Sequence, residues 1–193
     1  MRFSLVCLLA TAVLPALCRA QAPVFEVTKA DSSIKFSVKA SVALEGTFEK
    51  WDSTLTFTSP EATTGVLEVK IQADSVNTGS GVKDGKLKSK DFFDVKANPY
   101  ITFKSTKIIV TSPTSADVQG VFTIRGVSKP ETLTLKGARN PTGGTIDGIM
   151  AFDRKDYGMN SGIPFIKIAD RVEVNVHLAL HRTSGPPVVL PTP

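Results

Sequence analysis

The chain has 193 residues, 41% of them hydrophobic, and a formal net charge of +5. This length suits one domain, and so small a positive charge excludes the strongly basic surface of a typical nucleic-acid-binding domain. After residue 20 the sequence contains no apolar run long enough for a transmembrane helix.

Residues 1–20 are predicted to be a secretory signal peptide. Arg2 precedes a largely apolar run over residues 3–17, and the small residues Cys18 and Ala20 occupy the two positions that a signal peptidase reads before its cut. The run is too short and too poorly flanked to serve as a membrane anchor. The mature protein would therefore be periplasmic or secreted.

Cleavage at this point would leave a chain without cysteine. It would remove Cys7 and Cys18 together with Arg2 and Arg19, which lowers the net charge from +5 to +3. Such a chain has no disulfides, thiol catalysis or thiolate metal sites, so its core must stabilise it, and about 170 residues are enough for that. The alternative, in which Cys18 is retained and lipidated, is disfavoured because Leu17 stands where a small residue is expected.

From Ser33 onward, most of the sequence alternates apolar and polar residues with a period of two. The clearest runs are 33–39, 54–58, 67–74, 101–104, 122–125, 132–136 and 172–181. This pattern predicts antiparallel strands with one dry face and one wet face. Turn residues such as Ser59-Pro60 and Asn140-Pro141 separate the runs, as expected for a sandwich or a barrel.

The stretch 79–95 interrupts the strands. It is rich in lysine and carries Leu87 and the pair Phe92-Phe93, which predicts a short helix over an apolar opening, although Gly81 and Gly85 weaken a helix. The lysines are partly balanced by aspartates, so a solvated face is the favoured interpretation. Transient docking to an anionic membrane surface is the alternative.

The last strand and the end of the chain give further expectations. His177 and His181 share the polar face of the strand and lie about 13 Å apart, too far for one metal ion. A Ser/His/Asp site needs a histidine held in a cleft, so the outward position of both disfavours an enzyme. Residues 184–193 are rich in proline and are predicted to form a disordered tail.

Periodicity alone predicts an all-β domain and leaves two architectures open. A sandwich fills its interior with its own side chains. An extended antiparallel barrel of about eight strands can either fill itself or hold one small ligand.

Several stretches, in order, resemble the YceI-like family of polyisoprenoid-binding proteins. They are 31–38 with 46–48 and Trp51, then 73–105, 118–130 and 152–158. The resemblance implies that residues 21–183 form a lipocalin-like barrel, exported to the periplasm, with a short helical segment near its mouth. It also implies an apolar cavity for a polyisoprenoid or similar amphiphile, with no catalysis and no cofactor. Because the family often has histidine where this chain has Ser32 and Ala40, any contact made by those imidazoles cannot be carried over.

The candidate ligand-binding residues are the apolar side chains that the alternation turns inward, the two phenylalanines of the helical stretch, and one arginine. They are Phe36, Val38, Phe48, Leu55, Phe57, Leu67, Val69, Ile71, Phe92, Phe93, Phe103, Phe122, Ile124, Met150, Phe152 and Arg154. Which of them line a cavity and which pack in an ordinary core stays open, because most such faces simply pack. Apolar walls suit a hydrocarbon ligand, since each buried methylene contributes about 0.8 kcal/mol.

Arg154 has the same parity as Phe152, so its side chain is expected to point inward or toward the barrel rim. The favoured interpretation is an ion pair with Asp156 that stabilises the turn at Tyr157-Gly158. The alternative is a contact with a phosphate or carboxylate head group, which suits the geometry of a guanidinium.

The sequence therefore predicts a non-enzymatic, exported carrier or store for a long isoprenoid-like or fatty amphiphile. The alternative is a structural or interaction module whose barrel is filled by its own side chains. Homodimer formation is left open.

Overall fold

The computed structural model describes residues 21–41, 44–140, 143–162 and 167–190. Within these ranges the chain forms eleven β-strands, one α-helix and four short 3-10 turns. The strands are β1 (Val24–Val27), β2 (Ser33–Ala40), β3 (Leu44–Phe48), β4 (Trp51–Thr56), β5 (Val66–Gln72), β6 (Val76–Asn77), β7 (Tyr100–Ser112), β8 (Ser115–Ile124), β9 (Val127–Asn140), β10 (Gly143–Asp153) and β11 (Ile168–Ser184). The helix is α1 (Gly81–Lys88), and the turns are η1 (Lys29–Asp31), η2 (Ala62–Thr64), η3 (Ala73–Ser75) and η4 (Arg154–Tyr157).

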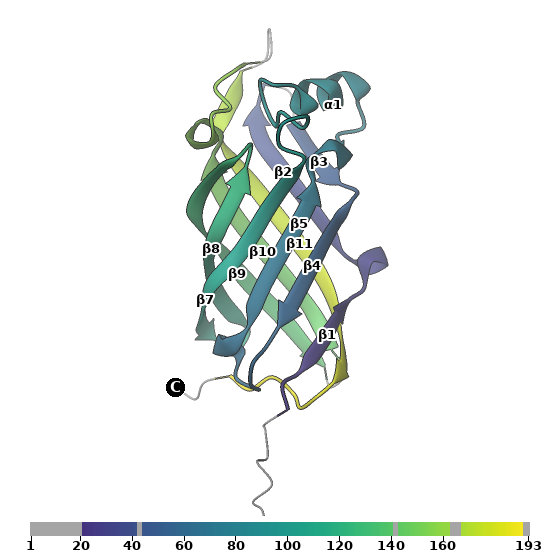
Figure 1. The fold of residues 1–193 in the computed structure, drawn as a ribbon, viewed down its shortest axis with the longest axis vertical. Helices are drawn as coiled ribbons and strands as arrows, with labels where there is room; N and C mark the ends of the chain where they lie inside the picture. The colour runs from purple at the N-terminus through teal and green to yellow at the C-terminus, as the bar shows by residue number, and fades with distance from the viewer. Residues whose placement is uncertain (1–20, 42–43, 141–142, 163–166, 191–193) are drawn as a thin grey trace, which may run out of the picture.

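The strands form one antiparallel sheet that curls strongly into a half-barrel (Figure 1). Their order is β4-β5-β7-β8-β9-β10-β11-β2-β3-β6, and β1 pairs with the last residues of β11. Side-chain contacts join the neighbourhoods of β1 and β4: the ring centroids of Phe25 in β1 and Phe57 just after β4 are 5.8 Å apart, and Lys29 of η1 pairs with Asp52 of β4. The curl therefore gives the sheet an inside and an outside.

The structure confirms a mostly β fold with one short helix, and it corrects the number of strands. Eleven strands are present in the described ranges where about eight were expected. β1 has four residues and β6 has two. Elements of that length are too short to display an alternation that a sequence pattern could reveal.

The alternation of the strands places the core inside the curl. In β5, Leu67, Val69 and Ile71 are buried while Glu68 and Lys70 between them are exposed. The same pattern continues around the sheet, and it produces one connected cluster of buried hydrophobic residues. The inward residues of each strand therefore decide how full the interior is.

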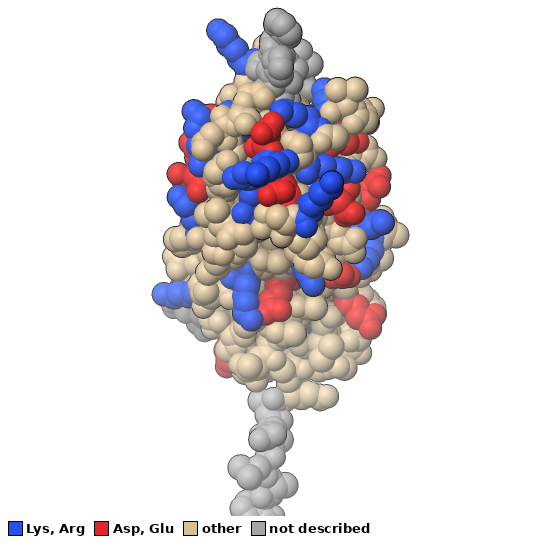
Figure 2. Space-filling view, turned by 45° about the horizontal axis from the view of Figure 1, so that its top comes forward, with Lys and Arg blue, Asp and Glu red and all other residues tan. Residues whose placement is uncertain are grey.

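Helix α1 covers one end of the half-barrel (Figure 1). Leu87 on the helix and Phe92 and Phe93 after it are buried in the core cluster. Asp84 holds the segment before the helix in place. Its carboxylate accepts hydrogen bonds from the backbone N–H of Thr78 at 2.8 Å and from the hydroxyl of Thr78 at 2.7 Å. Charged side chains of both signs gather around this end of the face shown in Figure 2, and fewer lie toward the opposite end.

The segment after β11 lies at the other end of the half-barrel (Figure 1). The predicted disordered tail began at Ser184, but Ser184 is the last residue of β11. Val189 then bridges to Glu61: the N–H of Ala62 donates to the carbonyl of Val189, and the N–H of Val189 to that of Pro60, each at 2.8 Å. Residues 185–190 thus hold a defined position against the barrel.

Some expectations fall outside these observations. The predicted signal peptide and residues 191–193 lie outside the described residues. Among the helices that are described, none is long and apolar enough to cross a membrane.

Candidate functional site

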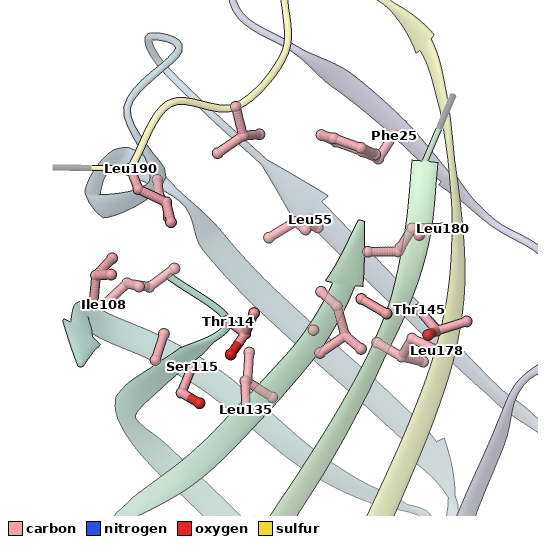
Figure 3. Close-up of a pocket in the computed structure, with 18 of the residues that line it drawn as sticks. Phe25, Leu55, Ile108, Thr114, Ser115, Leu135, Thr145, Leu178, Leu180 and Leu190 are labelled. Atoms are coloured by element: carbon pink, nitrogen blue, oxygen red, sulfur yellow. The ribbon is translucent and has the colours of Figure 1, made fainter. Parts of the chain in front are cut away.

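An apolar cavity opens at the end of the half-barrel opposite α1 (Figure 3). Its volume is about 250 Å³. Below it is called the open-end cavity. Its larger apolar lining residues are Phe25, Leu55, Phe57, Leu67, Ile108, Val110, Val118, Leu135, Ile146, Leu178, Leu180, Val188 and Leu190.

Small residues leave the space for this cavity. The small residues Ala116, Gly137 and Gly144 occupy inward positions of its wall, where larger side chains would fill the interior. Because protein interiors otherwise pack to the density of organic crystals, small residues at inward positions of the neighbouring strands β8, β9 and β10 leave part of the interior unfilled.

Two register shifts between β7 and β8 also shape the wall. They fall between Ser105 and Lys107 and between Val110 and Ser112. The first reverses the parity of β7, so that buried Phe103 and Ser105 are followed by Ile108 and Val110 in the cavity wall. An uninterrupted alternation would have turned Ile109 inward instead. This β-bulge geometry explains why the sequence pattern missed both residues.

The C-terminal segment completes the cavity. Pro187, Val188 and Leu190 line it, and the guanidinium of Arg182 donates to the carbonyl of Gly185 at the start of the segment. The polar residues Ser112, Thr114, Ser115, Thr145 and Arg182 lie in the same lining. The site thus offers apolar walls with a few hydroxyl groups and one guanidinium.

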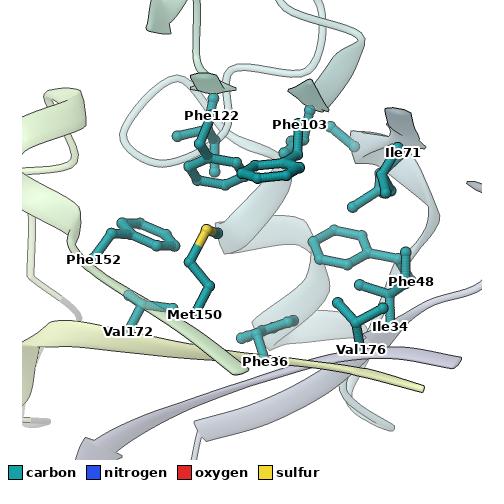
Figure 4. Packing of buried hydrophobic residues seen from close by; sticks show 14 of the residues in the cluster. Ile34, Phe36, Phe48, Ile71, Phe103, Phe122, Met150, Phe152, Val172 and Val176 are labelled. Atoms are coloured by element: carbon teal, nitrogen blue, oxygen red, sulfur yellow. The ribbon is translucent and has the colours of Figure 1, made fainter. Parts of the chain in front are cut away.

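The half of the interior next to α1 is filled (Figure 4). Phe36 and Phe48 have ring centroids 5.6 Å apart, and those of Phe122 and Phe152 lie 5.1 Å apart. Tyr157, with no exposed surface, packs edge-on against both rings of the second pair. The space left there, called the helix-end pocket below, has a volume of about 60 Å³.

The predicted ligand-binding residues fall into three groups. Leu55, Phe57 and Leu67 line the open-end cavity. The helix-end pocket is lined by Phe36, Val38, Phe48, Ile71, Phe92, Phe93, Phe122, Ile124, Phe152 and Arg154. Val69, Phe103 and Met150 are buried and line neither space.

Sequence reasoning missed most of the wall of the open-end cavity. Leu178 and Leu180 share the parity of Val174 and Val176 on the last strand, so a signal for them existed. Phe25 lies on the four-residue β1, which is too short to show a pattern. Val188 and Leu190 belong to the segment predicted to be disordered.

Arg154 is buried and bonds to the chain itself. Its guanidinium donates to the carbonyls of Ala169 at 3.2 Å, Ser161 at 2.9 Å and Met159, and to the carboxylate of Asp170 at 3.1 Å. The predicted Arg154–Asp156 pair is wrong, because η4 turns Asp156 outward to Lys129, 3.3 Å away. Arg154 instead ties the end of β10 to the start of β11.

Two pKa shifts occur near this arginine. The pKa of Asp170 is lowered, first by the hydrogen bond from the ammonium of Lys155 at 2.8 Å and further by Arg154. The pKa of Tyr157 is raised beyond its usual range, first by burial and then by its hydrogen bond to Glu131 at 2.9 Å. Both groups belong to the packed half.

The two histidines stand apart from both spaces. His177 contacts the exposed Asp147 at 2.6 Å on the outer face, and His181 is exposed. Neither lines the open-end cavity or the helix-end pocket. Across the described part of the chain, no three His, Cys, Asp or Glu side chains come together as a metal site.

Comparison with known proteins gives consistent matches. The model of the YceI-like domain matches residues 25–180. A UPF0312 protein of Pseudomonas savastanoi pv. phaseolicola is 31% identical over 133 residues, which cover 66% of this chain and 69% of the relative.

Two solved structures have the same fold. Burkholderia cenocepacia BcnA is 27% identical and aligns with a TM-score of 0.73 over 80% of this chain and 99% of its own. A polyisoprenoid binding domain from Saccharophagus degradans is 16% identical and aligns with a TM-score of 0.65 over 83% of this chain and 99% of its own. At that identity the second structure supports the fold alone.

Proposed function

The chain belongs to the YceI-like domain family, and from that premise we propose that it is an exported carrier or store for a single-chain apolar molecule, isoprenoid-like or fatty. The apolar end of this ligand occupies the open-end cavity, and the curled sheet works as a lipocalin-like container. The protein binds its ligand and does not transform it.

One observation carries this proposal: half of the interior is filled, and the other half is an apolar cavity of about 250 Å³. A hydrocarbon needs little directed bonding, because each buried methylene contributes about 0.8 kcal/mol. The lining also holds the hydroxyl groups of Ser112 and Thr114, which can hydrogen-bond to a polar head group. The domain of Saccharophagus degradans shares the fold and is a polyisoprenoid binding domain, so a fold of this kind can accommodate such a ligand.

Native mass spectrometry of the full-length protein purified from the exported fraction of its host tests the proposal. We expect a species heavier than the protein alone, and its extra mass should leave with organic extraction and match a single-chain lipid. A protein that shows only its own mass, and takes up no added lipid, would contradict the proposal.

A second candidate function rests on the packed half. A structural or interaction module needs a self-filled barrel, and the aromatic cluster around Phe122 fills one end in that way. The open-end cavity is the observation that favours the carrier. The same spectra separate the two, because a self-filled module carries no lipid.

Export itself is tested by the mass of the mature chain. Cleavage after Ala20 should yield a periplasmic or secreted form that begins at Gln21. An uncleaved chain in the cytoplasm would contradict this part of the proposal. Membrane docking stays an untested alternative, and homodimer formation stays open.

A further inference from the structure

A layer of side chains separates the open-end cavity from the helix-end pocket. Its members line neither space and are at most 8% exposed. They are Ile34, Val69, Phe103, Leu133, Met150 and Val176, and they are called the partition layer here.

The partition layer is continuous across the sheet. Val69 and Phe103 are register partners in β5 and β7, and Val176 and Ile34 are partners in β11 and β2. Met150 pairs with Val174 between β10 and β11, and its side chain points toward the rings of Phe122 and Phe103 in the view of Figure 4. On the cavity side of this layer, the next inward residue of β5, β9 and β11 lines the cavity, and these residues are Leu67, Leu135 and Leu178.

Two glycines let the layer close tightly. A Cβ atom on Gly120 would lie 2.6 Å from Cζ of Phe103, so the ring lies directly over that backbone. A Cβ atom on Gly148 would lie 3.0 Å from Cδ1 of Leu133. Phe103 and Leu133 therefore use the space that a glycine leaves, and a larger residue at either glycine would push the layer apart.

We propose that the partition layer is the floor of the binding site and limits the length of chain that the protein can bury. This inference rests on the proposed function. On β11, the cavity wall runs from Leu178 to Arg182, and four residues of strand span about 13 Å. Carbon–carbon bonds of about 1.5 Å fill this depth with on the order of ten carbons. The ligand is therefore a chain of medium length, or a longer one whose remainder leaves through the mouth.

The test is a displacement titration of a fluorescent apolar dye, N-phenyl-1-naphthylamine, from the delipidated full-length mature protein. The competitors are hexanoate, octanoate, decanoate, dodecanoate and hexadecanoate. Affinity should rise about fourfold for each methylene up to roughly decanoate and then level off. A fourfold gain per methylene that continues to hexadecanoate would overturn the floor while leaving the proposed function in place. If neither dye nor any chain binds, the proposed function itself fails.

Variants of the layer make the test specific. Met150→Ala and Phe103→Leu should open the floor toward the packed half and move the plateau to dodecanoate or longer. Phe93→Leu is the matched control, because Phe93 lies in the packed half against Phe48 and should leave the plateau unchanged. A plateau that stays in place in both opened variants contradicts the inference.

A wall variant keeps the test decisive where an opened variant does not fold. Leu178 lies just above the layer in the cavity lining. Leu178→Phe should raise the floor and move the plateau to chains shorter than decanoate. An unchanged plateau in this variant overturns the inference.

Discussion

The two halves of the barrel interior share the same strands and the same alternation, yet one half is solid and the other is hollow. In β8, Val118 faces the open-end cavity while Phe122 faces the packed half. In β10, Gly144 and Ile146 line the cavity while Phe152 belongs to the aromatic cluster. The curl of the sheet sets the space, and the size of the inward side chains decides whether that space is filled.

This difference assigns stability to the packed half of the sheet and ligand binding to the hollow half. Rings in the packed half contact one another and leave about 60 Å³, so this half contributes most of the packing energy. The aliphatic and small residues of the hollow half leave about 250 Å³. A ligand there would supply the contacts that the chain lacks. Mutations in the two halves should therefore have opposite profiles of stability and affinity.

The largest expected difference is between Phe122→Ala and Phe57→Ala. Phe122 is buried between Phe152 and Tyr157, so its loss should destabilise the protein by about 3–5 kcal/mol. Phe57 is half-buried and lines the cavity, so the ligand-free protein should lose less. Affinity for a fatty chain should fall for Phe57→Ala and hold for Phe122→Ala. Urea unfolding measures the stability of each variant, and dye displacement measures its affinity for the fatty chain. Equal losses of stability with no change in affinity would contradict the distinction between a packed half and a binding half.

A second comparison concerns the arginine of the packed half. Arg154→Met should destabilise the protein by about 2–3 kcal/mol, because it removes the hydrogen bonds that Arg154 donates to the carbonyls of Met159 and Ala169. Asp156→Asn should have almost no effect, since its partner Lys129 lies on the surface. Chemical unfolding of both variants checks this order. Similar losses of stability in the two variants would support the Arg154–Asp156 ion pair that the sequence predicted.

The alternation along a strand predicted correctly which side chains are buried, but it did not predict which residues form ion pairs. It placed Arg154 inside correctly, but Asp156, two residues on, falls in the 3-10 turn η4, where the period of two no longer holds. The same limit applies to the cavity. Leu55, Phe57 and Leu67 could be found from alternation, whereas Ile108 and Val110 lie beyond a register shift.

Composition also hid the role of the C-terminal segment. The stretch 184–193 holds four prolines, a composition typical of disorder, and no local pattern reveals that Val188 and Leu190 line an apolar cavity. That information lies in the tertiary structure, because the partner residues Pro60 and Ala62 are far away in the sequence. The family resemblance predicted a mostly β fold with an apolar cavity, but not which half of the interior is hollow.

Removing the C-terminal segment tests how the hollow half is closed. A chain that ends at Pro186 loses Val188 and Leu190 from the cavity wall. Because both are half-buried, we expect a loss of about 1–2 kcal/mol in stability. A bound fatty chain should dissociate several times faster, since one side of its cavity is missing. Stopped-flow dye exchange gives the rate, and an unchanged rate would show that the segment takes no part in closing the site.

The smallest expected effect is a pH response confined to the packed half. The hydroxyl of Tyr157 is buried and donates to Glu131, which raises the pKa of the phenol above its usual range. An acid whose folded pKa is raised keeps its full contribution below its unfolded pKa of about 10 and loses it as the pH rises above that value. Wild-type stability should therefore fall above about pH 10. Tyr157→Phe should lose about 1 kcal/mol at neutral pH by removing one hydrogen bond, but it should lack this part of the alkaline decline. Dye affinity of the open-end cavity serves as the internal control, because no titrating phenol lines that cavity. If the variant declines with pH as steeply as the wild type, the alkaline response arises elsewhere and does not distinguish the two halves.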